Sequence, residues 1–291
     1  MADNKLVSKP EWLKKKICLN SSNINDVKSL LIGLNLHTVC QSAKCPNIFE
    51  CFSRKTATFM LMGNICTRNC AFCGIEKGKP LLLDNKEPEN TAKAALNMGL
   101  DYVVLTSVTR DDLEDGGAKH FGRTVREIKK VMLESRVECL IPDLKGSLKN
   151  LEILLYSGPD VLNHNMETVE RNYRLIRKSA DYKRSINILK NSKIIIPDIL
   201  TKSGFMLGLG EGREEIYQLL FDLKNADCDI ITIGQYLSPG PKNFPVQKYY
   251  SPEEFEEIKR EAENFNFKSV ISGVFVRSSY NAAKVFSEIK R

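Results

Sequence analysis

The sequence predicts an α/β protein built as a partial (β/α)6 barrel of the TIM type, extended at the N-terminus and at the C-terminus. From about residue 57 onward, short apolar segments alternate with longer segments of helical periodicity. Short segments that are apolar throughout are typical of parallel strands buried on both faces. Six strand-then-helix units in succession favour an open or partial barrel over a full barrel of eight units.

The expected strands follow one another at regular intervals. We expect six strands and a closing segment, at residues 58–62, 102–106, 137–141, 160–163, 204–209, 229–233 and 269–276. In parallel α/β folds, ligands bind beyond the carboxyl ends of the strands. Candidate functional residues should therefore follow these segments directly.

The helices between the strands carry clear boundary signals. Residues 251–265 begin with Ser251 as N-cap, Pro252 in the first turn and Glu254 completing a capping box. Apolar stripes and terminal glycines predict three further helices, at residues 90–99, 148–158 and 212–226.

Six of the nine cysteines lie between residues 40 and 73, in two sets of three. The first triad is Cys40, Cys45 and Cys51, and the second triad is Cys66, Cys70 and Cys73. The second triad directly follows the first expected strand, at its carboxyl end. Each triad is one ligand short of a four-coordinate site, which suggests two soft-metal centres. A structural zinc site is the alternative for the second triad, but no histidine stands at zinc-finger spacing from it.

The other cysteines and the composition point to an ordinary globular protein. Cys139 and Cys228 lie in apolar surroundings and are expected to be buried, whereas Cys18 stays unassigned. The hydrophobic fraction is 42%, and neither a signal peptide nor an apolar run of membrane-spanning length is visible. We therefore expect a cytoplasmic protein without membrane contact, in which clustered cysteines bind metal.

The second triad has the pattern CxxxCxxC, with Phe72 before the last cysteine, after the first strand of a partial barrel. In this it resembles the radical S-adenosylmethionine (SAM) superfamily. The resemblance implies a 4Fe–4S cluster on the three catalytic cysteines Cys66, Cys70 and Cys73. It also implies that SAM binds the open iron and is cleaved to a 5′-deoxyadenosyl radical.

Further motifs resemble the lipoyl synthase family from about residue 10 to the end. They are CxxxxCxxxxxC at the first triad, VTRDDLEDGGA at 108–118, NHNMETV at 163–169, FMLGLGE at 205–211 and RSSYNA at 277–282. The resemblance implies an auxiliary 4Fe–4S cluster on Cys40, Cys45, Cys51 and Ser279, with Ser278 as the alternative register. It divides the chain into an extension, 1–54, and a barrel with the serine segment, 55–291.

The same resemblance implies the insertion of sulfur at C6 and C8 of a protein-bound octanoyl chain. It implies as partners octanoylated carrier domains, namely E2 subunits of 2-oxoacid dehydrogenases and the glycine cleavage H protein. An electron donor such as ferredoxin or flavodoxin is also implied. Biotin synthase is the rival enzyme, and an electron-transfer or zinc-binding protein is the rival outside enzymes.

Polar residues at one strand end are candidates for SAM binding. Asn163, Asn165 and Glu167 could bind its ribose or amino group, while alternation turns His164 to the opposite face as a core residue.

Several other charged residues stay open. Asp111, Asp112 and Asp115 could contact substrate or form a solvated acidic loop. Arg277 could pair with a carboxylate or brace the serine segment.

Basic residues concentrate in one stretch. Residues 171–193 hold eight Lys or Arg against one acid, Asp181, in a chain of net charge +7. The stretch could dock an acidic partner, or it could be a solvated helix face. No base-reading module is visible, so we expect no nucleic acid partner.

Overall fold

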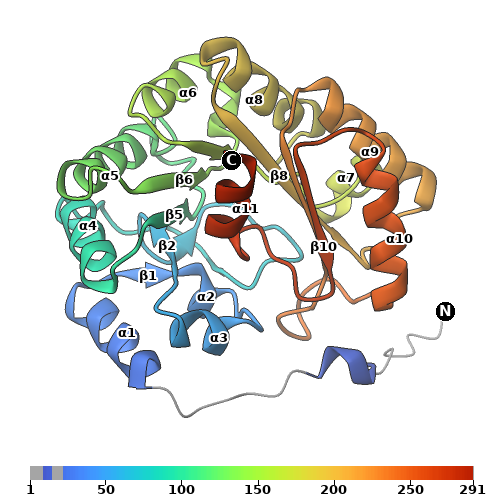
Figure 1. The fold of residues 1–291 in the computed structure, drawn as a ribbon, viewed down its shortest axis with the longest axis horizontal. Coiled ribbons are helices and arrows are strands. Elements are labelled where there is room, and N and C mark those ends of the chain that lie inside the picture. Colours follow the sequence, from blue (N-terminus) through green and yellow to red (C-terminus); the bar gives the residue numbers. More distant parts are fainter. Residues whose placement is uncertain (1–8, 15–21, 291) are drawn as a thin grey trace.

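The computed structural model describes residues 9–14 and 22–290, which form one curved sheet wrapped by helices (Figure 1). The sheet runs in chain order through β1 (His37–Thr38), β2 (Thr58–Leu61), β5 (Tyr102–Ser107), β6 (Arg136–Leu140), β7 (Val161–Asn163), β8 (Leu200–Leu207), β9 (Ile230–Gln235) and β10 (Ser269–Gly273). Strands β2 to β10 are parallel, and β1 pairs antiparallel with β2. Since β1 and β10 do not pair with each other, the sheet is an open barrel, and the predicted fold class is confirmed.

Six helices cover the outside of the sheet, and short elements fill the loops. The outer helices are α4 (Glu87–Met98), α5 (Ala118–Val131), α6 (Leu148–Leu155), α8 (Tyr182–Ile195), α9 (Arg213–Asn225) and α10 (Pro252–Glu263). The remaining elements are η1 (Glu11–Leu13), α1 (Ser22–Gly33), α2 (Val39–Ser42), α3 (Ile48–Ser53), β3 (Ile65–Cys66), β4 (Glu76–Lys77), η2 (Leu144–Gly146), η3 (Glu170–Asn172), α7 (Tyr173–Ile176) and α11 (Ala282–Ile289). The predicted capping box of α10 is present between Ser251 and Glu254.

Two strand boundaries differ from the sequence prediction by three residues or more, and the others by two at most. Strand β8 begins at Leu200, four residues before the expected start, because its polar residues Thr201, Lys202 and Ser203 are buried in the sheet and do not read as an apolar run. Strand β10 ends at Gly273 rather than at residue 276. The chain then leaves the sheet, and the carbonyl of Phe275 accepts a hydrogen bond from the side chain of Asn47.

A buried polar group forms the floor of the barrel. The Lys202 ammonium lies 3.1 Å from both carboxylate oxygens of Glu138, which also accept hydrogen bonds from Asn163 and the Tyr102 hydroxyl. The charges of Lys202 and Glu138 are thus satisfied through one another and their neighbours, as a buried ion pair requires.

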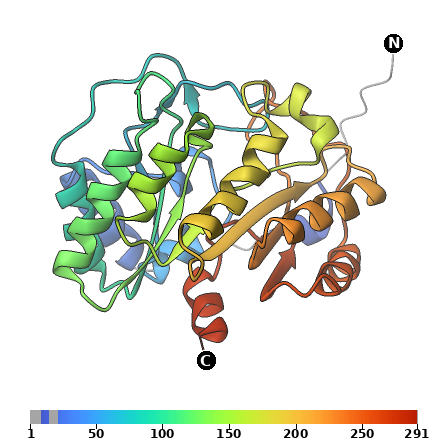
Figure 2. The same cartoon turned by 90° about the horizontal axis from the view of Figure 1, so that it is seen from above.

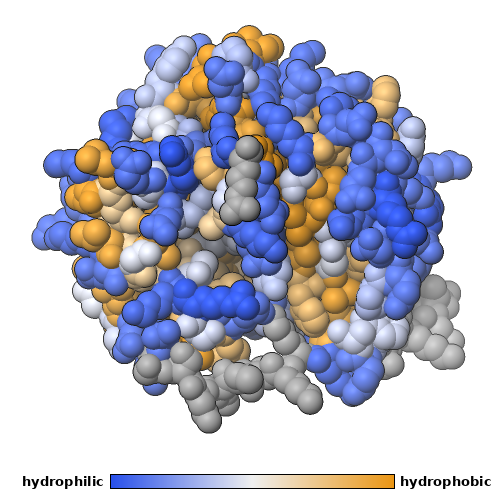
Figure 3. Space-filling model, in the orientation of Figure 1, coloured by the Kyte–Doolittle hydropathy of each residue, from blue (hydrophilic) through white to orange (hydrophobic). Residues whose placement is uncertain are grey.

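Helix α11 lies across the amino-terminal end of the barrel, below this floor (Figure 2). There the ring of Phe286 packs against that of Tyr102, with 5.6 Å between the centroids. Figure 3 shows the same face, with an apolar strip between α11 and α10 over the open edge of the sheet. The carboxyl ends of the strands are left for a functional site. No helix in the described part of the chain is long and apolar enough to cross a membrane.

Candidate active site

One cavity of about 540 Å³ occupies the carboxyl-terminal half of the barrel and brings the two cysteine triads together. Five of the six triad cysteines and both serines of the RSSY motif line it, namely Cys40, Cys45, Cys66, Cys70, Cys73, Ser278 and Ser279. Cys51 lies on α3, half-buried beside the same wall. The structure thus places residues from both ends of the chain around a single space.

The second triad lies in a loop that begins at the end of β2. The Cys66 sulfur accepts hydrogen bonds from the backbone N–H groups of Arg68 and Thr109, both at 3.4 Å. Burial raises the pKa of the Cys70 thiol, and it raises the pKa of the Cys73 thiol to about 12. Without metal these thiols are neutral, and metal binding has to release their protons.

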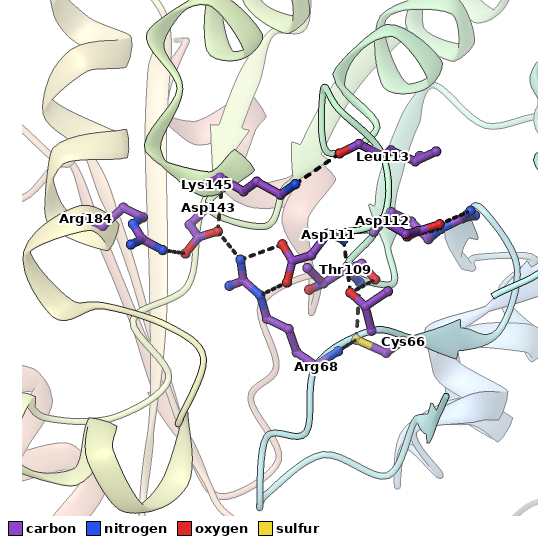
Figure 4. Close-up of polar contacts among 11 residues, drawn as sticks. Cys66, Arg68, Thr109, Asp111, Asp112, Leu113, Asp143, Lys145 and Arg184 are labelled. Atoms are coloured by element: carbon purple, nitrogen blue, oxygen red, sulfur yellow. Dashed lines mark hydrogen bonds and ion pairs between the residues drawn. The ribbon is translucent and has the colours of Figure 1, made fainter. Parts of the chain in front are cut away.

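Arg68, between the first two cysteines of this loop, is almost fully buried and anchors the loop (Figure 4). Its guanidinium lies 2.6 Å from a carboxylate oxygen of Asp111, after β5, and 2.7 Å from one of Asp143, after β6. Arg184 of α8 binds the other oxygen of Asp143 at 3.2 Å. Although burial alone would raise it, hydrogen bonds and charge from Arg68 lower the pKa of Asp143 to about 2. The loop is therefore tied to two neighbouring strand ends.

The acidic loop 111–115 is neither a free solvated loop nor part of the cavity wall. Asp112 pairs with Arg110, and Asp115 accepts hydrogen bonds from the backbone N–H groups at the start of α5. None of Asp111, Asp112 and Asp115, all of them described, lines the cavity. Their carboxylates hold the loops that surround it.

The candidate SAM-binding residues divide between the cavity wall and the floor. Asn165 and Glu167 line the cavity, and the Asn165 amide donates to the Glu167 carboxylate at 3.1 Å. Asn163 instead donates to Glu138 at 2.7 Å, below the cavity. His164, directly after the end of β7, also lines the cavity, contrary to the alternation argument.

Arg177 is a site residue that the sequence analysis counted only as one cation of a basic stretch. It is buried in the cavity wall, and one guanidinium nitrogen donates to the carbonyls of Asn165 and Met166 at 3.1 Å. No local signal in the sequence marks it, because η3 and α7 separate it from the end of β7.

Three buried polar atoms of cavity-lining residues lack a hydrogen-bond partner among the described residues: Ser107 Oγ, His164 Nε2 and Arg177 Nε. Burial and the charge of Arg177 lower the pKa of His164 to about 4, so this imidazole is neutral at pH 7. Unpaired buried polar atoms are costly, and a polar ligand in the cavity would satisfy them. These walls fit a ligand with carboxylate and hydroxyl groups, as SAM has.

The first triad is closed by the C-terminal segment 277–280. The Thr58 hydroxyl donates to Ser279 Oγ at 2.8 Å. Thr58 also hydrogen-bonds the Cys40 thiol, whose pKa burial raises to about 11. Ser278 points the other way, and its hydroxyl donates to the side-chain oxygen of Asn165 at 2.6 Å. The two serines therefore face different parts of the cavity, and Ser279 is the one beside Cys40.

The neighbours of Ser278 and Ser279 lie against the first triad as well. Tyr280 donates its hydroxyl to Glu50, next to Cys51, at 3.2 Å. Arg277 lies within electrostatic range of Cys45 and Glu167, and it donates to the Val276 carbonyl at 2.6 Å rather than pairing closely with a carboxylate. Arg277 therefore braces the serine segment.

Two glycines of the sheet make room for this segment inside the barrel. A Cβ at Gly234 would lie 2.2 Å from the Val276 carbonyl oxygen, and one at Gly204 would lie 2.9 Å from Ser278 Oγ. Any side chain at either position would collide with the segment, so the close approach requires glycine.

The donor set fits iron–sulfur clusters better than a single zinc ion. Within the described ranges, no three His, Cys, Asp or Glu side chains converge closely enough to hold one metal ion. The thiolates of a 4Fe–4S cluster each bind a different iron, so they stand farther apart than zinc ligands. Cys139 and Cys228 are buried away from the cavity, as expected, and Cys18 lies outside the described residues.

Comparisons with known proteins identify the family. Residues 60–223 match the model of the Radical SAM superfamily, and residues 2–45 match the N-terminal domain of lipoyl synthase of the Radical SAM family. The chain is 51% identical to the lipoyl synthase of Caldicellulosiruptor bescii over 276 residues, which cover 95% of this chain and 94% of that protein. This chain belongs to the lipoyl synthase family. It is also 52% identical to the lipoyl synthase of Caldanaerobacter subterraneus, over 95% of this chain and 96% of that protein.

Solved structures share the fold of this chain. Methylornithine synthase (PylB) has a TM-score of 0.56 at 16% identity, covering 90% of this chain and 85% of that chain. HydG, a maturase of the [FeFe]-hydrogenase, has a TM-score of 0.60 at 15% identity, covering 79% and 53%. Members of the lipoyl synthase family are enzymes that use SAM and 4Fe–4S clusters, and this chain therefore uses the same cofactors.

Proposed function

We propose that this enzyme inserts two sulfur atoms, at C6 and C8 of an octanoyl chain held on a carrier protein, and so forms the lipoyl group. One observation carries the proposal: both cysteine triads border the same cavity. The same stretch of substrate can then meet a radical source and a sulfur donor without leaving the site. Biotin synthase remains less suitable, since it does not account for the first triad and the RSSY serine.

We assign the cluster ligands by triad. Cys66, Cys70 and Cys73 would hold the cluster that binds SAM, and Cys40, Cys45, Cys51 and Ser279 would hold the auxiliary cluster. When bound, these groups supply one-electron chemistry and sulfur to a carbon that has no acidic proton and no leaving group. The hydrogen bond from Thr58 and the neighbouring Cys40 support Ser279 over Ser278 as the fourth ligand.

The protein's own residues bind the cosubstrate and exclude water. Asn165 and Glu167 supply an amide and a carboxylate for the hydroxyl or amino groups of SAM, and Arg177 supplies a buried cation for its carboxylate. The partnerless atoms of Arg177 and His164 are free to receive such a ligand. The apolar part of the lining, with Met60, Phe205 and Val276 among it, keeps the reacting carbon away from water.

A serine ligand suits a cluster that gives up sulfur. Oxygen is a harder donor than thiolate and a poorer match to iron–sulfur iron, so the iron at Ser279 would be held less firmly. A Ser279→Cys variant should bind iron normally but turn over differently. Unchanged turnover would remove this role from the serine.

We further propose the setting of the reaction. The carrier proteins are E2 subunits of 2-oxoacid dehydrogenases or the glycine cleavage H protein, and ferredoxin or flavodoxin supplies electrons. The enzyme works in the cytoplasm, where thiols stay reduced. Residues 1–54 act as the extension that carries the auxiliary cysteines, and residues 55–291 act as the barrel with the serine segment.

The decisive experiment is anaerobic. The protein is reconstituted with iron and sulfide, supplied with SAM, a reductant and an octanoyl-lysine peptide, and its products are weighed by mass spectrometry. We expect a product that carries two added sulfur atoms. A variant with Ala at Cys40, Cys45 and Cys51 should still cleave SAM but add no sulfur. Sulfur insertion by that variant, or no sulfur product from the intact enzyme, would overturn the assignment.

A further inference from the structure

Three neighbouring helices begin with basic residues, against the preference of a helix N-terminus for negative charge. Helices α5, α6 and α8 carry no acid in the first turn, where the sequence places Lys119, Lys149 and the pair Lys183–Arg184. By contrast, α4, α9 and α10 each carry two glutamates there. Because the helix dipole makes a cation unfavourable at this end, the three basic starts work against helix stability.

These basic starts lie together at the rim of the barrel that surrounds the active-site cavity. Each of the three helices follows the carboxyl end of a strand, and the helices pack in the order α5, α6, α8 (Figure 1). Lys119, Lys145 and Lys149 line one surface cavity of about 580 Å³. The Arg184 side chain packs near Gly146, and its guanidinium binds Asp143, two residues from Lys145 in the chain (Figure 4). Five cations thus form one surface, the rim surface: Lys119, Lys145, Lys149, Lys183 and Arg184.

The acids around the rim surface neutralise it in part, since Asp143 pairs with Arg184 at 3.2 Å. Asp115 and Asp181 accept hydrogen bonds from backbone N–H groups at the starts of α5 and α8, which leaves Glu114 as the further acid lining the surface cavity. Among the described residues, no ion pair involves Lys119, Lys149 or Lys183. Their positive charge faces solvent.

The basic stretch 171–193 is not itself a continuous docking face. Arg171 pairs with Glu215, Arg177 is buried in the active-site wall, and Lys193 pairs with Asp229. Arg174 and Lys178 remain exposed in the connection before α8, and Lys183 with Arg184 at the start of α8 joins cations from two other helices. The exposed basic surface is therefore at the rim of the barrel and not on the single stretch 171–193.

We propose that the rim surface docks an acidic carrier domain and directs its octanoyl-lysine into the active-site cavity. The inference rests on the proposed function, which requires a protein-bound substrate to approach this end of the barrel. Its position supports this role, because Arg184 pairs with Asp143, which in turn pairs with Arg68 in the loop of the second triad. A negatively charged partner would reverse the unfavourable interaction of the three lysines with the helix dipoles.

The test uses the reconstituted holoenzyme with two substrates, an octanoylated carrier domain and a short octanoyl-lysine peptide. The variant reverses Lys119, Lys149 and Lys183 to Glu. We expect KM for the carrier domain to rise about tenfold or more, kcat to stay the same, and the salt dependence of kcat/KM to weaken. Both kinetic constants for the peptide should remain unchanged, since the peptide makes no use of the rim.

Matched controls separate docking from general effects of charge. Lys190 is also on α8 but lies two turns farther from the rim than Lys183. The variant Lys190→Glu should therefore leave KM for the carrier domain unchanged. The triple variant should melt no lower than the original protein, because it places acids at three helix N-termini. A lower melting temperature would mean that the lysines serve the fold, and the inference would fail.

The possible failures are distinguishable. Absence of peptide turnover by the unaltered enzyme would refute the proposed function and not the rim surface. Normal peptide turnover with an unchanged KM for the carrier domain in the triple variant would refute the rim surface alone. If the variant instead lost binding to single-stranded DNA or to anionic vesicles but kept its KM for the carrier, the surface would serve another partner and the inference would fail.

Discussion

The two cysteine triads border the same cavity but are held in place in opposite ways. The second triad lies in a loop whose main anchor, Arg68, binds Asp111 and Asp143, 43 and 75 residues along the chain. The first triad depends on the other end of the protein, because Thr58 and Glu50 meet Ser279 and Tyr280 across 221 and 230 residues. One site is anchored by buried charge from neighbouring strands, and the other is closed by a distant segment.

This difference teaches that the two sites can fail separately. Damage to the buried charges around Arg68 should affect mainly the second triad. Damage to the C-terminal segment should affect mainly the first triad. The following predictions test that separation, from the largest expected effect to the smallest.

Arg68→Met should have the largest effect on stability. It leaves the carboxylate of Asp143 buried with Arg184 as its remaining cationic partner, and breaking a buried ion pair costs about 3–5 kcal/mol. We expect a loss of that order in the free energy of unfolding of the apoprotein, measured by denaturant titration. After reconstitution, iron should be lost from the second triad and kept at the first.

Arg126→Met serves as the control for Arg68→Met, because Arg126 is exposed on the outer helix α5. It should change the stability by less than about 0.5 kcal/mol. Equal loss of iron from both triads in Arg68→Met would show that the two sites are not independent.

The buried His164 should make the apoprotein less stable in mild acid. Its pKa is lowered to about 4, so between pH 6.5 and 4 the unfolded chain binds a proton that the folded protein does not. Stability should therefore fall by about 3 kcal/mol as the pH drops through this window. Asp143, with a pKa of about 2, stays ionised in the folded protein there.

Denaturant titrations at several pH values measure this effect, and His164→Gln should remove most of the slope between pH 6.5 and 4. A slope that persists in the variant would assign the acid sensitivity to other groups.

Gly204→Ala should damage the first triad through the C-terminal segment. The added methyl group would stand 2.4 Å from Thr232 Oγ1 and 2.9 Å from Ser278 Oγ. We expect a loss of about 1–3 kcal/mol in stability from overpacking. Because Ser279 is displaced with its neighbour, roughly half of the bound iron should be lost, and it should come from the auxiliary site.

The control is Gly33→Ala, where a Cβ would meet nothing within 4 Å. Iron analysis together with electron paramagnetic resonance of the reduced protein separates the two clusters. Retention of both clusters in Gly204→Ala would contradict the role of the glycine.

Tyr280→Phe should have the smallest effect. It removes one hydrogen bond of 3.2 Å to Glu50 at a partly exposed position. We expect a loss of about 0.5–1 kcal/mol in stability and a modestly faster release of iron from the first triad to a chelator. Faster release of iron from the second triad instead would contradict the claim that the C-terminal segment holds the first triad.

Much of the fold could be predicted from the sequence because most of the strands are apolar and the helices have strong end signals. The start of β8 could not, since Thr201, Lys202 and Ser203 are polar yet buried, and only the facing Glu138 makes burial of the lysine tolerable. An ion pair between residues so far apart in the sequence cannot be predicted from local sequence patterns.

The cysteine spacings and strand ends predicted where the site lies, but not its walls. Arg177 and His164 became visible as wall residues only through burial, which depends on elements far along the chain. The place of Ser279 beside Cys40 rests on a contact across the whole barrel that spacing alone could not indicate. For the acidic loop, the sequence showed the carboxylates but not the arginines that they bind.

The route of the C-terminal segment has a consequence for the order of events during synthesis. The first triad leaves the ribosome well before Ser279 and Tyr280, which contact Thr58 and Glu50 across 221 and 230 residues. The barrel strands can pair as they emerge, but contacts that span more than two hundred residues form late and slowly. Until residues 277–280 have been made, the first triad lacks the segment that covers it in the folded protein. Under the proposed assignment of Ser279, the auxiliary cluster would be completed only after this segment has been made, and a chain truncated before residue 277 would acquire the second triad's cluster alone.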